Sequence, residues 1–378
     1  MKLAYINVTQ LPSTLANSIA VMKMCQALTQ AGHQVRLYVP GSGPLIWYEL
    51  ATQYGLSERF EIHRLKTLPV WRSYDFAYQA VRAARQWGAE LVYTRGVHIA
   101  LAGLQRGLPV IYEIHQPPSG SLAPRMFRWF CASRAPKRLV VITEALRQML
   151  ALKYGMKMPA EQVIIAPSGV DLERFANLPT PQEARAHLGL AEGFTAVYSG
   201  HFYAGRGMDV LFELAKALPE VHFIWAGGKP EHVADWRAKL DGAGVKNVLL
   251  PGFIDHQQLP LYQAAADVLL LPHERGAAGS GGVVIAEVCS PLKLFDYMAS
   301  GRTILSSDLP VLREVLTDFN SRLVPPGDIP AWIQALKSLQ ADPVHRLELA
   351  TQARRDASQY AWSARARKVT AGFPPSRH

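Results

Sequence analysis

The chain has 378 residues, and at about 150 residues per domain its length predicts two or three domains. Apolar residues make up 49% and charged residues 19% of the chain, which excludes a disordered protein, a collagen and a coiled coil. Lys and Arg outnumber Asp and Glu by 40 to 30. The resulting net charge of +10 favours a nucleic acid, an anionic membrane or a phosphate-bearing substrate as partner, or reflects simple solubility.

In the first half, short apolar runs rich in β-branched residues alternate with longer helical patterns. Between the first two runs, residues 18–31 place Ile19, Met22 and Leu28 on one helical face, and Gly32 ends the helix. A strand, a helix and a strand in succession are typical of the βαβ unit of a parallel sheet. The expected strands are Lys2–Val8, Gln34–Val39, Leu91–Thr94, Pro109–Ile114, Leu139–Ile142 and Val163–Ala166.

A second series of the same kind begins near Phe194, after a linker and a short helix within residues 177–193. Its expected strands are Ala196–Gly200, His222–Ala226, Asn247–Leu250, Asp267–Leu271, Thr303–Ser306 and Ser321–Val324. The expected helices are Asp209–Leu218, Pro230–Asp241, Gln258–Ala265, Pro291–Ala299 and Ile329–Leu339, followed by a helical stretch over residues 341–370. We therefore predict two doubly wound α/β halves, with ligands bound in a cleft beyond the carboxyl ends of the strands.

Two expected strands of the first half end in side chains that can bond a sugar. His115 closes the segment 112–115 (YEIH), and its place at a strand's carboxyl end would let it bond a sugar hydroxyl or transfer a proton. Arg95 and His98 follow another strand in the same way. The alternative in each case is a structural side chain in a loop.

A glycine-rich turn, residues 198–207 (YSGHFYAGRG), joins an expected strand to a helix. Glycines such as Gly200 let a ligand approach the backbone closely, and His201 and Arg206 are placed to bind a diphosphate. The turn is not the dinucleotide-binding fingerprint, and no G-x-x-x-x-G-K-[ST] phosphate loop occurs in the chain.

Residues 290–301 (SPLKLFDYMASG) give the strongest local signal. Ser290 is a favourable N-cap and Pro291 suits a first helical position. The N-terminus of such a helix presents unpaired N–H groups and partial positive charge, which makes it a phosphate site, and Lys293 adds a cation. Asp296 follows six residues after the cap, where a carboxylate would hydrogen-bond a pair of ribose hydroxyls. The alternative is an ordinary capped amphipathic helix.

In this order, the segments resemble the retaining glycosyltransferases of family 4, which have the GT-B fold. The resemblance covers most of the chain, from the first helix and second strand of the family at residues 18–39 to its nucleotide-binding helix at 290–301. Residues 112–115 look like its strand ending in an active-site His. Further matches are residues 141–145 (VITEA), 167–171 (PSGVD) and 259–272 (LPLYQAAADVLLLP).

The resemblance implies two Rossmann-like, doubly wound parallel-sheet domains that face a central cleft. Residues 1–176 would form the acceptor-side domain and residues 177–355 the domain that binds a nucleotide sugar. The C-terminal helix, residues 356–378, would return to the first domain.

The resemblance also implies which residues bind the nucleoside-diphosphate sugar. Asp296 replaces the usual ribose-binding Glu, Arg206 stands where the family has a Lys, and His201 where it has an Arg. The residues expected at the diphosphate are Gly200, His201, Arg206, Ser290, Pro291, Leu292 and Lys293.

The chain departs from the family pattern at two places. A Glu that contacts the transferred sugar normally precedes the ribose carboxylate by eight residues, but position 288 is Val. Glu287 is its expected replacement, with the glycine-rich loop 274–282 making room for the shift in register. The family's glycine pair near the N-terminus is also missing, and a loop that ends at Asn17 takes its place. We expect His115 and Glu287 to be the catalytic residues, with Asn17, Arg95 and His98 on the acceptor side.

The implied activity is transfer of a hexose-type sugar, with retention of configuration, in glycolipid or surface-polysaccharide synthesis. Cations and the helix N-terminus would stabilise the leaving diphosphate, so no divalent metal or other cofactor is expected. A non-catalytic, membrane-associated homologue and a sugar-nucleotide epimerase remain as alternatives. The donor base, the sugar and the acceptor are left open by the sequence.

Residues 122–138 (LAPRMFRWFCASRAPKR) interleave bulky apolar side chains with Arg and Lys. This pattern is typical of segments that lie on an anionic membrane surface, and the alternative is a helix that buries its aromatic residues. A nucleic acid is not expected, because no motif that reads one is present.

The cysteines and the apolar runs indicate where the protein works. Cys25, Cys131 and Cys289 are far apart and form no C-x-x-C pair, so neither a disulfide framework nor a structural zinc site is expected. No run of about 18 apolar residues occurs, and the N-terminus does not read as a signal peptide. We expect a cytoplasmic protein, peripheral on the inner face of the cell membrane.

Overall fold

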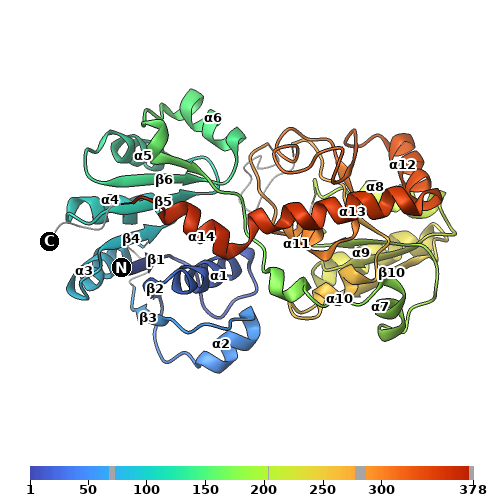
Figure 1. The fold of residues 1–378 in the computed structure, drawn as a ribbon, viewed down its shortest axis with the longest axis horizontal. Coiled ribbons are helices and arrows are strands. Elements are labelled where there is room, and N and C mark those ends of the chain that lie inside the picture. The colour runs from blue at the N-terminus through green and yellow to red at the C-terminus, as the bar shows by residue number, and fades with distance from the viewer. Residues whose placement is uncertain (68–72, 203, 277–286, 374–378) are drawn as a thin grey trace. The chain divides into compact units, whose positions relative to one another are not determined.

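The computed structural model describes residues 1–67, 73–202, 204–276 and 287–373. The chain forms two compact units, which we call the first and the second unit (Figure 1). The first unit comprises Met1–Gly169 and the chain from Trp362 onward, and the second comprises Val170–Ala361. The breaks thus fall at 169/170 and 361/362, whereas the sequence analysis placed them at 176/177 and 355/356.

The first unit contains a seven-stranded parallel sheet in the order β3-β2-β1-β4-β5-β6-β7. Most of its strands are apolar and buried on both faces, as expected of a parallel sheet covered by helices. The strands are β1 (Lys2–Ile6), β2 (Gln34–Pro40), β3 (Glu61–Leu65), β4 (Leu91–Thr94), β5 (Val110–Ile114), β6 (Lys137–Val141) and β7 (Val163–Ile165). The strand order reverses beside β1, which puts the carboxyl ends of β1 and β4 at the switch point where such sheets bind ligands.

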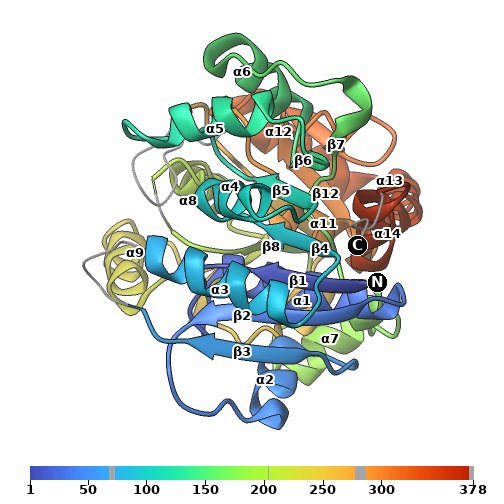
Figure 2. The same ribbon diagram turned by 90° about the vertical axis from the view of Figure 1, so that its left-hand side faces the viewer.

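Helices cover both faces of this sheet (Figure 2). Right-handed crossovers put α3, α4 and α5 in a row on one face, while α1 packs against α14 on the other. The helices are α1 (Ala16–Gln30), α2 (Trp47–Tyr54), α3 (Tyr74–Gln86), α4 (Val97–Gln105), α5 (Ala123–Ala132), α6 (Glu144–Tyr154) and α14 (Trp362–Thr370).

The stretch from α2 to α3 was missed by the sequence analysis, which expected no element there. Strand β3 lies at the edge of the sheet and alternates exposed Glu61 and His63 with half-buried residues, so it lacks a continuous apolar run. Helix α3 does have an apolar face, with Phe76, Ala80 and Val81 buried. The other strands of this sheet lie within about two residues of their expected bounds.

The second unit contains a six-stranded parallel sheet in the order β10-β9-β8-β11-β12-β13. Its strands are β8 (Thr195–Ser199), β9 (His222–Ala226), β10 (Val248–Gly252), β11 (Val268–Leu271), β12 (Thr303–Ser307) and β13 (Arg322–Val324). Its helices are α7 (Pro181–His187), α8 (Met208–Ala217), α9 (Pro230–Gly242), α10 (Leu259–Ala264), α11 (Leu292–Ser300), α12 (Ile329–Ala341) and α13 (Pro343–Ala357). Trp225 and Trp332 are buried in the core between sheet and helices.

After α13, the chain returns to the first unit as α14, as the resemblance implied for its last helix. Trp362, the first residue of α14, packs directly against the backbone of Gly169. A Cβ atom on Gly169 would lie 2.4 Å from the Trp362 ring, so only glycine fits at this position. None of the helices in the described part of the chain is long and apolar enough to cross a membrane.

Candidate functional site

The glycine-rich turn after β8 packs against the beginning of α11 in the second unit. Gly200 has φ +146°, and a Cβ atom on it would lie 2.2 Å from Nζ of Lys293. The absence of a side chain at Gly200 therefore makes room for the Lys293 ammonium group beside the backbone.

The amino group of Lys293 is buried and has no hydrogen-bond partner among the described residues. Its Nζ atom lies 4.1 Å from the centroid of the Tyr198 ring and makes no hydrogen bond to any described residue. Burial, together with the charge of Arg206, holds the pKa of Lys293 well below its ordinary value. A buried ammonium group costs several kcal/mol unless an anion compensates it, so this position favours a negatively charged ligand.

Arg206 is held by a residue that the sequence analysis did not select. Its Nη1 atom donates to Nε2 of His273, 2.6 Å away, just beyond the carboxyl end of β11. His273 is buried, and burial together with Lys293 and Arg206 lowers its pKa well below the ordinary value, so the ring is neutral and accepts. The sequence did hold a signal for His273, because the residue follows the buried strand β11 at the carboxyl edge of the sheet, where ligands bind.

The start of α11 differs from the prediction by one residue. The helix begins at Leu292 with Pro291 as N-cap, because the ψ of Pro291 is 127°, which is extended and not helical. Ser290 therefore is not the N-cap, and the N-cap residue Pro291 makes no side-chain capping hydrogen bond. The backbone N–H groups of Leu292 and Lys293 lie in the first turn of α11 and have no acceptor within the helix, so they can bind a phosphate.

The two acidic candidates of the second unit lie on either side of this helix start. Asp296 is half-buried, three residues after Lys293 and hence on the same side of α11. Glu287 is exposed and Val288 is buried. Glu287 directly follows residues 277–286, which include most of the glycine-rich loop and lie outside the described residues.

His201 lines a small cavity beside the turn. The other walls include Gly200, Gly228, Phe253 and Ile254, at the carboxyl ends of β8, β9 and β10. Burial lowers the pKa of His201, and neighbouring basic side chains lower it further; these are Lys293, Arg206, Lys229 and His232. The turn therefore carries a concentration of positive charge next to a partly apolar cavity.

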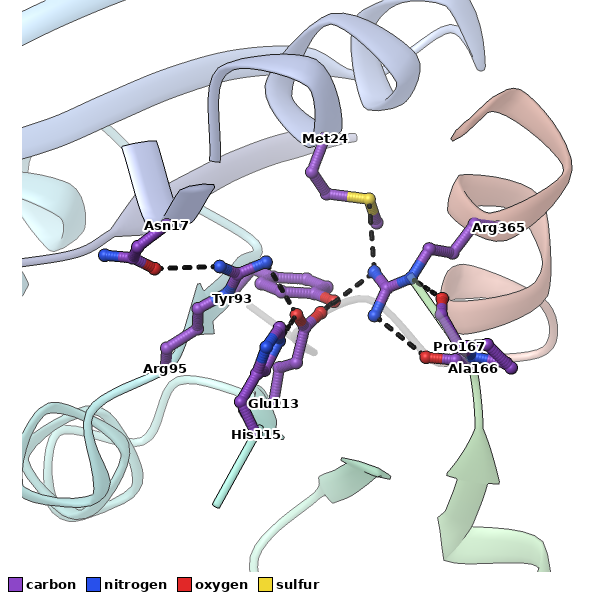
Figure 3. A network of polar contacts seen from close by, with 9 residues as sticks. All are labelled: Asn17, Met24, Tyr93, Arg95, Glu113, His115, Ala166, Pro167 and Arg365. Atoms are coloured by element: carbon purple, nitrogen blue, oxygen red, sulfur yellow. Dashed lines mark hydrogen bonds and ion pairs between the residues drawn. The ribbon is translucent and has the colours of Figure 1, made fainter. Parts of the chain in front are cut away.

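In the first unit, the carboxylate of Glu113 is the centre of a buried polar network (Figure 3). Oε1 forms an ion pair with Nη2 of Arg95 at 2.8 Å and accepts from Nε2 of His115, and Oε2 accepts from Nη1 of Arg365 at 2.9 Å and from the hydroxyl of Tyr93. Burial alone would raise the pKa of Glu113, but Arg365, Arg95 and His115 hold it well below its usual range.

This network brings three predicted residues together. Arg95 donates from Nη1 to Oδ1 of Asn17 at 2.9 Å, and through Glu113 it is linked to His115. Burial and the charge of Arg95 lower the pKa of His115 to about 4, although Glu113 opposes this, so the ring is neutral at physiological pH. Neither Glu113 nor Arg365 was selected from the sequence.

His98 lies apart from the network. Its Nε2 atom is 3.3 Å from Oγ of Ser73, its ring packs on Tyr74, and it lines a groove formed by α3, α4 and α5. The same groove is lined by Tyr78, Met126 and Trp129.

The basic aromatic segment 122–138 divides into core and surface. Phe127 and Phe130 are buried, and so are Lys137 and Arg138, which belong to β6. About half of the aromatic and basic side chains that we expected on a membrane-facing surface therefore lie in the core. The exposed residues include Leu122, Arg125, Arg128, Trp129 and Arg134.

Sequence models of two families match the chain. That of Glycosyltransferase Family 4 matches residues 18–174, and that of Glycosyl transferases group 1 matches residues 193–342. The chain belongs to glycosyltransferase family 4. The prediction of this family from the ordered segments is confirmed.

Relatives of this family 4 glycosyltransferase include enzymes named for lipid acceptors. A phosphatidyl-myo-inositol mannosyltransferase of Mycolicibacterium smegmatis is 24% identical over 366 residues, which cover 91% of this chain and 86% of that one. An alpha-galactosylglucosyldiacylglycerol synthase of Streptococcus pneumoniae is 30% identical over 123 residues, 30% of this chain and 33% of that one.

Solved structures show the same fold. HepE of Anabaena in complex with UDP has a TM-score of 0.74 at 17% identity, with 98% of each chain covered. Sucrose-phosphate synthase of Thermosynechococcus elongatus has a TM-score of 0.74 at 19% identity, with 97% of this chain and 96% of that one covered. The predicted GT-B fold of this family 4 glycosyltransferase is therefore confirmed.

Proposed function

We propose that this family 4 glycosyltransferase transfers a hexose from a nucleoside-diphosphate sugar to an acceptor in glycolipid or surface-polysaccharide synthesis, with retention of configuration. The observation that carries the proposal is the buried Nζ atom of Lys293, which lacks a polar partner among the described residues and lies beside Arg206 and the N-terminus of α11. A diphosphate supplies the anion that this arrangement lacks. The names of the two lipid-glycosylating relatives support the acceptor class.

In the proposed reaction, the second unit stabilises the leaving group. The nucleoside diphosphate gains negative charge as the glycosidic bond breaks, and Lys293, Arg206 and the N–H groups at the start of α11 would face that charge. One well-placed donor of this kind contributes about 3–4 kcal/mol to transition-state stabilisation. Because these groups supply the positive charge, we infer that no divalent metal is needed, and excess EDTA should leave the transfer rate unchanged.

The remaining candidates divide between the donor and the acceptor. Asp296 would bond the ribose hydroxyls, and the cavity beside His201 would take the base. Glu287 and His115 would contact the transferred sugar, while Asn17 and Arg95 would lie toward the acceptor.

The test is a binding screen with uridine, guanosine and adenosine diphosphates. We expect one of the three to raise the melting temperature, and Lys293→Met to weaken its binding at least about tenfold. Lys337→Met, at an exposed position on α12, is the matched control and should bind as the wild type does. If the protein binds none of the three nucleoside diphosphates, the proposal is wrong.

A specific observation favours a second function, binding to an anionic membrane surface. On the face formed by α3, α4 and α5, the aromatic side chains of Trp129, Tyr78 and Tyr74 are 64%, 53% and 41% exposed. Arg106 lies over the Tyr78 ring at 4.5 Å, and Arg128 is exposed next to Trp129. Exposed aromatic residues among arginines fit the interface between lipid headgroups and acyl chains.

Vesicle sedimentation tests this second function. The protein should sediment with phosphatidylglycerol vesicles and not with phosphatidylcholine vesicles, and Trp129→Ser combined with Arg128→Ser should abolish most of the binding. Phe319→Ser removes an aromatic residue of the second unit that is 82% exposed, and should leave vesicle binding intact. Equal binding by both variants would contradict a membrane role for this face.

A further inference from the structure

The network around Glu113 fixes a histidine ring in one protonation and hydrogen-bonding state. Glu113 lies on β5 and His115 directly follows that strand, so the two side chains are two residues apart and share one face of the sheet. The ionised carboxylate of Glu113 only accepts hydrogen bonds. Nε2 of His115 must therefore carry the hydrogen of their mutual bond.

The other ring nitrogen is then a hydrogen-bond acceptor. A neutral imidazole has one N–H, and with that hydrogen on Nε2 the Nδ1 atom has only its lone pair. No hydrogen bond from the described residues uses Nδ1 of His115, and the side chain is 33% exposed. The ring thus presents an unused acceptor at the carboxyl end of β5.

Charge explains why the ring stays neutral. Two guanidinium groups, those of Arg95 and Arg365, already surround the single carboxylate of Glu113, so the buried cluster is positive without His115. A protonated His115 would be a third cation, and both its burial and the repulsion from the two guanidinium groups disfavour it. Consistently, burial and Arg95 lower the pKa of His115 to about 4, so it does not donate its ring proton to a substrate at neutral pH.

Arg365 holds the carboxylate on the side away from His115. Its Nη1 binds Oε2 of Glu113, while Nε donates to the carbonyl of Pro167 at 2.7 Å and Nη2 to that of Ala166 at 3.1 Å (Figure 3). The planar guanidinium is therefore fixed by these three bonds to oxygen and by a weaker one from Nη1 to Sδ of Met24 at 3.5 Å. A Lys ammonium at this position would keep the charge but not this geometry.

We propose that Glu113 and Arg365 are positioning residues, which hold His115 as a neutral hydrogen-bond acceptor for a sugar hydroxyl. Arg365 comes from α14, so the last helix of the chain is part of the site in the first unit. This inference rests on the proposed glycosyl transfer for the identity of the hydroxyl, and on the geometry alone for the state of the ring.

The state of the ring can be measured without any substrate. In full-length protein labelled with ¹⁵N-histidine, long-range ¹H–¹⁵N correlation spectra distinguish the two neutral tautomers from the cation, and His115→Gln assigns the signal. We expect His115 to carry its hydrogen on Nε2 throughout pH 6–8. Glu113→Gln should convert it to a mixture of tautomers, because a carboxamide accepts or donates. Arg365→Met keeps the carboxylate, so the hydrogen should stay on Nε2, but the loss of this cation should raise the pKa of His115.

Kinetics then tests whether this state matters for transfer. We expect Glu113→Gln and Arg365→Met to lower kcat about tenfold or more, Arg365→Lys to lower it less, and all three to bind the nucleoside diphosphate as the wild type does. Asp267→Asn is the matched control, because it breaks the Arg185–Asp267 pair of the second unit (3.0 Å), whose side chains are also mostly buried. It should lower the melting temperature while leaving the His115 signal and kcat unchanged.

Two results would overturn the inference: a wild-type His115 that carries its hydrogen on Nδ1 or is protonated at neutral pH, or a folded Glu113→Gln protein whose kcat lies within twofold of wild type. Absence of transfer by the wild type with every nucleotide sugar would instead refute the proposed function. The spectra of His115 would still decide the positioning role of Glu113 and Arg365.

Discussion

At the scale of single residues, the two units treat buried charge in opposite ways. The carboxylate of Glu113 has cationic partners on both oxygens, whereas the ammonium group of Lys293 has the Tyr198 ring and no polar partner among the residues described. A satisfied buried charge fixes its surroundings, and an unsatisfied one favours a ligand. This contrast is why we place a binding role on Lys293 and a positioning role on Glu113.

His273 offers a residue-scale prediction. Its neutral ring accepts the hydrogen bond of Arg206, and hydrogen bonds to charged groups contribute about 1.5–3 kcal/mol. His273→Phe removes the acceptor and should weaken binding of the preferred nucleoside diphosphate about tenfold, measured by calorimetry. His273→Gln keeps an acceptor and should bind nearly as well as wild type, and equally weak binding by both variants would contradict this role for His273.

At the scale of elements, the sequence predicted those strands that form continuous apolar runs. The strands buried on both faces were found within about two residues, while the edge strand β3, with its exposed Glu61 and His63, was missed. The start of α11 was misplaced because Ser290 and Pro291 both favour a helix N-terminus, and only the extended ψ of Pro291 decides between the registers.

Some residues of the candidate sites were also predictable from the sequence, and others were not. His115 and Lys293 follow from their places at a strand end and a helix start, and these are local signals. Arg365 could not be found locally, because it lies 252 residues from Glu113 in the chain and only the fold brings the two together. His273 has a local signal but no motif around it.

The contact between Trp362, at the start of α14, and the backbone of Gly169 gives an element-scale prediction. Gly169→Ala would place a methyl carbon 2.4 Å from the Trp362 ring, so we expect a lower melting temperature and weaker docking of α14. Gly242→Ala, in α9, has nothing within 4 Å of the new Cβ and should stabilise the protein by up to about 1 kcal/mol. Thermal unfolding of both variants checks this, and a Gly169→Ala protein as stable as wild type would contradict it.

At the scale of the whole molecule, the net charge of +10 has several origins. Part of it surrounds the proposed diphosphate site, part is exposed on α5, and part, such as Arg138 and Arg365, is buried in the first unit. The sum alone did not separate these origins, because composition does not record position.

Buried histidines give a whole-molecule prediction about pH. The pKa of His115 is lowered to about 4 and that of His273 well below its ordinary value of 6.5, so the unfolded chain binds their protons first as the pH falls. Stability should therefore decrease from about pH 6.5 toward pH 4, and the lowered pKa of Glu113 adds to the loss at the acid end. Melting temperatures at pH 4–8 test this, and His273→Gln should show a shallower decrease than His345→Gln, which alters an exposed residue of α13.

The return of α14 to the first unit also sets an order of events during synthesis. A ribosome makes residues 1–169 long before Arg365, so the growing first unit holds Glu113 with one guanidinium group fewer until the second unit has been made. Domains fold as units during translation, generally the N-terminal one first. In this protein α14 is made after all residues of the second unit, so the first unit is begun first but its residues are completed last.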